Sequence, residues 1–209
     1  TATMTITVNP NVTPTFTQVA PICSGAVLSL PTTSNNGISG TWSPAINNIA
    51  TTTYTFTPSV GQCATTNTMT ITVNPNITPT FTQVAPICSG AVLNSLPTTS
   101  NNGINGTWSP AINNTATTTY TFTPSVGQCA TTATMTITVN PNVTPTFTQV
   151  APICSGAVLS SLPTTSNNGI NGSWSPAINN TATTTYTFTP SVGQCAVATT
   201  MQIVVFPTA

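Results

Sequence analysis

Cysteine offers the most distinctive chemistry in this chain, and its six cysteines fall into three evenly spaced pairs. The two members of each pair stand 40, 41 and 41 positions apart: Cys23 and Cys63, Cys88 and Cys129, Cys154 and Cys195. No Cys-x-x-Cys motif occurs, and no His is present to complete a zinc site. The spacing therefore predicts one disulfide within each pair, formed in an oxidising compartment. Closing a loop of about 40 residues would stabilise each unit by roughly 4 kcal/mol.

The rest of the composition excludes several classes of function. The 209 residues include no Lys, Arg, Asp, Glu or His. General acid–base catalysis needs a side chain that titrates near neutral pH, and a Ser, Thr or Cys nucleophile needs a base or a positive charge beside it. We therefore expect no enzyme, no catalytic residues and no cofactor. Binding of nucleic acid depends on Lys and Arg, and calcium sites depend on carboxylates, so neither a nucleic-acid partner nor a metal site is expected.

An uncharged surface favours self-association, because no net charge keeps the molecules apart. Thr, Ser and Asn must hydrate this surface instead. The expected partners are neighbouring repeats or chains of the same protein, and surface glycans are a second candidate. No uninterrupted apolar run is long enough for a membrane helix, so no membrane insertion is expected in this segment. Together with the cysteine pairs, these features favour an extracellular or cell-surface location.

The cysteine pairs recur because the chain is an array of near-identical repeats. Boundaries after each Asn-Pro give repeats at 11–75, 76–141 and 142–209. Residues 1–10 match Thr132–Pro141, the last strand of a repeat, so we expect the chain to be a segment of a longer polypeptide. A period near 66 residues favours separate domains over a solenoid, whose units are shorter and share one core. The connector at 73–79 carries two prolines, which predicts a stiff link and a rod-like array.

Each repeat is predicted to be all-β. In the first repeat, alternation of apolar residues with Thr predicts strands at 15–19, 26–28, 40–43, 51–57 and 68–73. The Thr-Ser-Asn-Asn-Gly sequence at 33–37 predicts a turn, since Asn-Gly accepts the positive φ that tight hairpins need. Two layers of such strands make a small β-sandwich.

One aromatic set recurs in every repeat and is predicted to form the core: Trp42, Trp108, Trp174, Tyr54, Tyr120 and Tyr186. In the first repeat we expect Phe16, Val27, Phe56, Met69, Ile71 and Val73 to join it. An alternative for the tryptophans is exposure as platforms on which sugars stack.

Threonine alternates along three segments, at 3–7, 53–57 and 68–72. A flat array of hydroxyls would suit ice or a crystalline polysaccharide, while the structural interpretation is that Thr is the outward residue of an uncharged strand. Several Asn-x-Ser/Thr motifs match the N-glycosylation pattern, and chance explains many of them in such a composition: they begin at Asn11, Asn76, Asn105, Asn113, Asn142, Asn171 and Asn179.

A family resemblance is carried by three strings of the second repeat, at 96–104, 106–110 and 119–124, within the Cys…Trp…Cys pattern. With them the chain resembles the immunoglobulin-like tandem repeats of very large surface proteins of Bacteroidetes, especially flavobacteria, which are exported by the type IX secretion system. The resemblance implies a secreted, adhesin-like stalk or fibre. Only 21 positions separate Trp42 from Cys63, so we expect a trimmed sandwich with one disulfide per repeat.

The expected function is therefore structural, a stiff stalk or filament. The apolar face of residues 1–10, formed by Met4, Ile6 and Val8, has no repeat of its own here, which suggests assembly by strand addition to a neighbouring chain. The alternative is a binding module that contacts ice or glycan through its Thr-rich strand faces.

Overall fold

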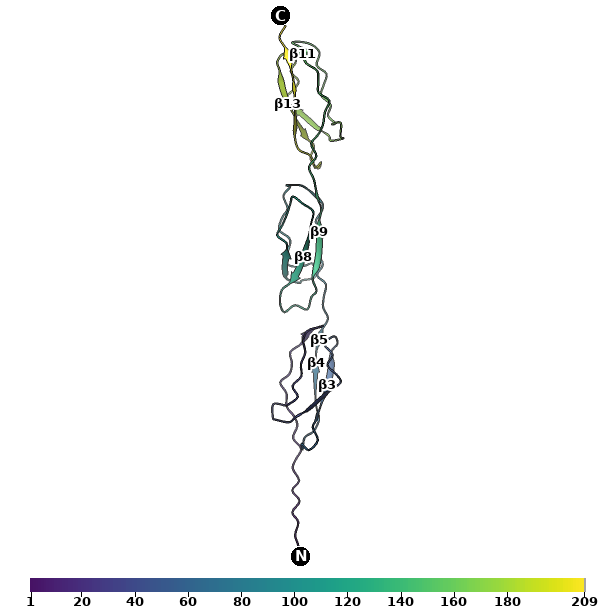
Figure 1. Cartoon of the computed structure of the whole chain (residues 1–209), viewed down its shortest axis with the longest axis vertical. Coiled ribbons are helices and arrows are strands. Elements are labelled where there is room, and N and C mark those ends of the chain that lie inside the picture. The colour runs from purple at the N-terminus through teal and green to yellow at the C-terminus, as the bar shows by residue number, and fades with distance from the viewer. Residues whose placement is uncertain (209) are drawn as a thin grey trace. The chain divides into compact units, whose positions relative to one another are not determined.

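All regular secondary structure in the computed structural model is β-strand (Figure 1), and the structure describes residues 1–208. No helix occurs among these residues. The prediction of an all-β chain is therefore confirmed. Its physical basis is the abundance of β-branched Thr, Val and Ile, which favour the extended backbone over a helix.

Five strands recur in each repeat. In the first repeat they are β1 (Ile22–Cys23), β2 (Gly40–Ser43), β3 (Thr52–Pro58), β4 (Asn67–Ile71) and β5 (Val73–Asn74). In the second they are β6 (Ile87–Cys88), β7 (Gly106–Ser109), β8 (Thr118–Pro124), β9 (Ala133–Ile137) and β10 (Val139–Asn140). In the third they are β11 (Ile153–Cys154), β12 (Gly172–Ser175), β13 (Thr184–Pro190), β14 (Thr199–Ile203) and β15 (Val205–Phe206).

The strands form two sheets per repeat. A three-stranded sheet has the orders β2-β3-β4, β7-β8-β9 and β12-β13-β14, and a two-stranded sheet pairs the first and last strands of each repeat. The larger sheet of the first repeat is antiparallel, with Trp42 opposite Phe56 and Tyr54 opposite Met69. The smaller sheet is parallel, with Cys23 opposite Asn74. The predicted strands at 40–43, 51–57 and 68–73 correspond to β2, β3 and the pair β4 and β5.

By its internal contacts the chain divides into two compact units. The first comprises residues 1–81, 98–107 and 122–133, and the second comprises 82–97, 108–121 and the chain from 134 onward. Each unit thus contains one complete terminal repeat together with part of the second repeat. The predicted repeat boundaries at 11–75, 76–141 and 142–209 stay predictions.

The core lies on one face of the larger sheet. Tyr54 and its equivalents Tyr120 and Tyr186 are fully buried, as predicted. The Tyr54 hydroxyl donates to the Asn47 carbonyl and accepts from the Asn47 N–H, at 3.0 and 2.8 Å, so the buried oxygen is satisfied. Trp42 is half-buried at the edge of this core: its ring packs 5.2 Å from that of Phe56, and its indole N–H donates to the Pro31 carbonyl.

Glycine is required at the start of β2. A Cβ on the buried Gly40 would lie 2.6 Å from Cζ of Phe56 and collide with the Thr57 carbonyl oxygen. The same collisions occur at Gly106 and Gly172. The missing side chain lets the neighbouring strand and the buried phenylalanine approach closely.

The predicted strands at 15–19 and 26–28 are wrong, since neither segment joins a strand. Side-chain amides take several of the backbone bonds that a neighbouring strand would supply. The Thr15 N–H donates to Asn36 Oδ1 at 3.1 Å, Asn67 Nδ2 donates to the Pro14 carbonyl, and Gln18 Nε2 donates to the Thr70 carbonyl. The irregular segment nevertheless packs Phe16, Val19 and Leu28 against the core. Val27, predicted to be buried, is 95% exposed.

The turn predicted at 33–37 is present, but Asn36 does not adopt the positive φ expected for the Asn-Gly pair. The Gly37 N–H donates to the Ser34 carbonyl, and the Ser34 N–H donates to the Ile38 carbonyl. Within this turn only Gly37 has positive φ, at 85°, and every residue with positive φ in the described chain is a glycine. The loop therefore follows the three-residue hairpin pattern, which needs a single glycine in the left-handed region.

Candidate functional site

Two disulfides connect successive repeats. Cys23 bonds to Cys129 and Cys88 bonds to Cys195, across sequence separations of 106 and 107. In both cases the first cysteine of one repeat joins the second cysteine of the next repeat. The predicted pairing within repeats is therefore wrong, although four of the six predicted cysteines are disulfide-bonded. The other two, Cys63 and Cys154, form no disulfide and are exposed.

Pairing within a repeat fails because its two cysteines lie at opposite ends. Cys23 lies opposite Asn74 at the end of the last strand, whereas the Cys63 carbonyl accepts a hydrogen bond from the Val12 N–H at the start of the repeat. The intervening run from Asn67 to Asn74 is extended and spans about 26 Å at ~3.3 Å per residue. A disulfide requires Cα atoms within about 7 Å, and the bonded pairs have Cα atoms 5.0 Å apart.

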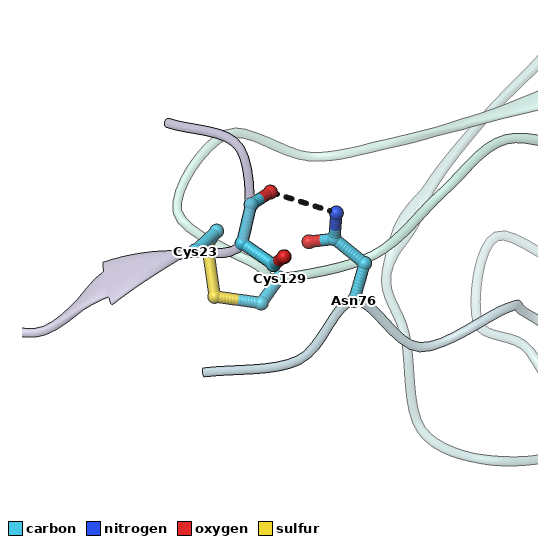
Figure 2. The surroundings of a disulfide bond; sticks show 4 residues. Cys23, Asn76 and Cys129 are labelled. Carbon is cyan, nitrogen blue, oxygen red and sulfur yellow. Dashed lines mark hydrogen bonds between the residues drawn. A yellow bond between two sulfur atoms is a disulfide. The ribbon is translucent and has the colours of Figure 1, made fainter. Parts of the chain in front are cut away.

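Each junction combines three connections. The peptide linker runs from Asn74 to Asn76, and the disulfide joins Cys23 to Cys129 beside it. Figure 2 shows Asn76 next to this disulfide, where its Nδ2 donates to the Ser24 carbonyl at 3.0 Å. The Cys129 carbonyl accepts from the Ile77 N–H at 2.9 Å, which anchors the second cysteine to the residue that follows Asn76.

The second junction repeats this arrangement. Asn142 Nδ2 donates to the Ser89 carbonyl at 2.9 Å, next to the Cys88–Cys195 disulfide. The Cys195 carbonyl accepts from the Val143 N–H at 2.8 Å. The recurrence indicates that the junction is a built feature of the repeat.

A second candidate site is the outer face of the larger sheet. Thr53 lies opposite Thr70, and their Oγ1 atoms are 2.7 Å apart, within hydrogen-bonding distance. The same contact joins Thr119 and Thr136 at 2.7 Å. All outward side chains of this face in the first repeat carry hydroxyls, and all but the half-buried Thr55 are exposed: Thr41, Ser43, Thr53, Thr55, Thr57, Thr68 and Thr70.

Residues 1–10 carry a third feature. They belong to no strand (Figure 1). The side chains of Met4, Ile6 and Val8 are 85%, 76% and 86% exposed. The equivalent residues of the first repeat, Met69, Ile71 and Val73, are buried. The apolar face that completes the core of a repeat is therefore open to solvent in this segment.

The chemistry of these sites is covalent coupling and hydrogen bonding without charge. Among residues 1–208 no cluster of three metal-ligating His, Cys, Asp or Glu side chains is present, and within the same range no helix has the length and apolar character to cross a membrane. The disulfides are typical of an oxidising environment outside the cytoplasm.

We predict that removing the amide of one junction makes its own disulfide easier to reduce. The Asn76 hydrogen bond and the Cys23–Cys129 disulfide hold the same two repeat ends, so each favours the other. A hydrogen bond contributes about 0.5–1.5 kcal/mol, so Asn76→Ala should shift the reduction equilibrium of Cys23–Cys129 by about 2- to 10-fold. The measurement is mass spectrometry of alkylated peptides after equilibration in thiol buffers.

The second junction supplies the matched control. Asn142→Ala should shift the Cys88–Cys195 equilibrium and leave Cys23–Cys129 unchanged, and Asn76→Ala should do the reverse. Equal shifts at both disulfides in either variant would contradict a local role of the amide. The same peptide maps test the pairing, since a Cys23 peptide linked to a Cys63 peptide would overturn it.

No protein-family model matches this chain, and a search of curated proteins finds no significant match. The features of the molecule that bear on its function are the junctions, the hydroxyl-bearing face and the exposed apolar residues of segment 1–10.

Proposed function

We propose that this chain is a structural segment of an extracellular stalk or filament, built from tandem immunoglobulin-like repeats arranged as a rod. The observation that carries the proposal is the pair of disulfides that join each repeat to the next. Its partners are repeats and chains of its own kind. The sequence resemblance to surface repeats of Bacteroidetes supports the same role and a secreted, adhesin-like location.

A comparison of magnitudes favours a mechanical purpose over simple stabilisation. In the chain-entropy model a disulfide that closes about 100 residues stabilises by about 4.7 kcal/mol, and one that closes about 40 residues by roughly 4 kcal/mol. Linking neighbours therefore adds less than ~1 kcal/mol over linking within a repeat. What changes is the covalent path, because each linker now has a second covalent connection beside it.

This second connection limits how far a repeat can be extended. The second repeat holds both Cys88 and Cys129, and each is bonded to a different neighbouring repeat. Tension entering at Cys129 and leaving at Cys88 crosses only the 41 positions between them, in place of the whole repeat. Unfolding under load then releases less chain, which suits a stalk that must keep its length.

We predict a shorter extension on forced unfolding when the disulfides are intact. At about 3.3–3.6 Å per residue, the 66-residue second repeat reaches about 230 Å when fully extended, and the disulfide-limited path reaches about 145 Å. Single-molecule stretching of the oxidised chain between its ends should show the shorter release, and addition of reductant should restore the longer one.

A variant that lacks both junction disulfides is the matched control. Replacing Cys23, Cys88, Cys129 and Cys195 by Ser should restore the longer release for the second repeat without reductant, because load then crosses the whole repeat. Identical contour lengths in oxidised and reduced chains would contradict the mechanical role.

Strand addition is a further part of the proposal. The exposed Met4, Ile6 and Val8 repeat the pattern that Met69, Ile71 and Val73 bury in the first repeat. Residues 1–10 would add to a sheet of a neighbouring chain and bury this face there. Met4, Ile6 and Val8 would then complete the hydrophobic core of a repeat in another chain.

We predict that deleting residues 1–10 weakens self-association without unfolding the repeats. Sedimentation velocity measures the association, and near-UV circular dichroism reports the packed tyrosines. A chain with Met4, Ile6 and Val8 replaced by Asn keeps the length of the segment and should behave like the deletion. Assembly that is unchanged in both variants would exclude strand addition.

The second candidate function is binding of ice or glycan by the hydroxyl face. The observation that favours it is the registered pairing of exposed threonines, such as Thr53 with Thr70, across neighbouring strands. This pairing also uses part of their hydrogen-bonding capacity, which leaves fewer free donors for a ligand.

If the face binds ice, the chain should inhibit ice recrystallisation, and a variant with Thr53→Tyr and Thr70→Tyr should lose the effect because the bulky rings break the flat surface. The measurement is crystal growth in a frozen sucrose solution, with the variant as control. No inhibition by the native chain at high concentration removes ice as the ligand.

A further inference from the structure

The two cysteines without a disulfide occupy the same positions in their repeats as the bonded ones. Cys154 is the first cysteine of its repeat, like Cys23 and Cys88, and Cys63 is the second, like Cys129. Both are exposed, whereas the four bonded cysteines are partly buried. The junction pattern therefore leaves the first cysteine of one repeat and the second cysteine of another without a disulfide.

The surroundings of Cys154 match one half of a junction. Cys154 lies opposite Phe206 in parallel register, as Cys23 lies opposite Asn74. The Ser155 N–H donates to the Phe206 carbonyl at 2.8 Å, as the Ser24 N–H donates to Asn74 at 2.8 Å. The Ser24 carbonyl accepts from Asn76, but within residues 1–208 the Ser155 carbonyl accepts no hydrogen bond.

The surroundings of Cys63 match the other half. The Cys63 carbonyl accepts from the Val12 N–H at 2.8 Å, as the Cys129 carbonyl accepts from Ile77. The residue before Val12 is Asn11, at the position of the junction amides Asn76 and Asn142. Asn11 is exposed, and its amide has no hydrogen-bond partner in the described part of the chain. The Ser155 carbonyl thus lacks the donor that Asn11 could supply, and the Asn11 amide lacks the acceptor that Ser155 could supply.

We propose that Cys154 of one copy of this chain forms a disulfide with Cys63 of a second copy, and that Asn11 of the second copy donates to the Ser155 carbonyl of the first. The result is a covalent head-to-tail chain of copies, joined by the disulfide and the Asn–Ser hydrogen bond of the junctions within each copy but without their peptide linker. The inference deepens the proposed structural function and rests on it for its biological purpose. The partner is recognised by its Asn-and-cysteine half junction, which another repeat of this type on the same polypeptide would also supply.

The coupling is an oxidation and needs an electron acceptor, which we take to be a small-molecule disulfide. The Cys154 thiolate attacks this disulfide, forms a mixed disulfide and releases one thiol of the oxidant. The Cys63 thiolate then attacks the Cys154 sulfur and displaces the second thiol. Two protein thiols have lost two electrons and two protons, and one oxidant disulfide has become two thiols. No charged side chain repels the approaching copies, since the sequence contains none.

Two variants, each with one cysteine replaced, test whether Cys154 pairs specifically with Cys63 of another copy. Cys63→Ser keeps only the Cys154 half, and Cys154→Ser keeps only the Cys63 half, so neither can pair correctly with itself. With oxidised glutathione, each variant alone should stay largely monomeric, and an equimolar mixture should give a one-to-one disulfide dimer that grows no further. Non-reducing electrophoresis and peptide mass spectrometry, with one variant labelled with heavy nitrogen, identify the Cys63–Cys154 bond between chains.

The amide supplies the specificity control. Adding Asn11→Ala to the Cys154→Ser variant should reduce the yield of mixed dimer by about 2- to 10-fold, the range expected for one lost hydrogen bond. The oxidised native chain should form a ladder of multimers that reductant collapses. Equal dimerisation of either variant alone would overturn the proposal in favour of random thiol oxidation, and so would a mixture that stays monomeric.

The source of the partner repeat is tested separately. A chain extended after its last residue by a further copy of repeat 76–141, with the copy of Cys88 replaced by Ser, should bond Cys154 to the second cysteine of the added repeat and lose the ladder. Persistence of the full ladder in this longer chain would contradict recognition through the shared half junction. Failure of the mixture, combined with the shortened extension predicted for the oxidised second repeat, would reject copy-to-copy coupling and leave the structural function standing.

Discussion

The constraint on which this structure depends is the placement of the two cysteines at opposite ends of each repeat. The chain runs from Val12 to Cys23 beside the run from Ala64 to Asn74 in the same direction, with bridges at both ends. A disulfide reaches only a few ångströms between Cα atoms, so it cannot span that length. Oxidation therefore has to join neighbours. A disulfide usually closes a loop within a small secreted domain, but here it couples one repeat to the next.

Because the chain has no Lys, Arg, Asp, Glu or His, its side-chain contacts are made by uncharged groups. Side-chain amides replace both salt bridges and part of the strand pairing: Asn36 and Gln18 bond the backbone over the core, and Asn76 bonds across the junction. Each such bond contributes modestly, but none depends on pH through a titrating partner or is screened by salt. A chain built this way keeps its contacts in surroundings of variable pH and ionic strength.

The elements that could be predicted from the sequence are those with a local residue pattern. Alternation of Tyr54 and Phe56 with Thr placed β3 and its buried face, and Gly37 placed the turn. Prediction failed where the outcome depends on a distant partner. The apolar Phe16 and Val19 show that a segment covers the core, but not whether a strand or a side-chain amide takes its backbone bonds. Cysteine spacing likewise gives no information on which end of a repeat each thiol occupies; that follows only from the parallel pairing of β1 with β5.

The pairing rule also has a consequence for any array of these repeats. Disulfides within repeats would leave every unit closed and every boundary dependent on its peptide linker. Because the first cysteine of one repeat bonds to the second cysteine of the next, Cys154 and Cys63 have no disulfide partner within residues 1–208. The open halves are complementary in both the thiol and the Asn–Ser hydrogen bond. If Cys154 and Cys63 of different copies join as proposed, the junction between two chains uses the same disulfide and Asn–Ser hydrogen bond as the junction between two repeats.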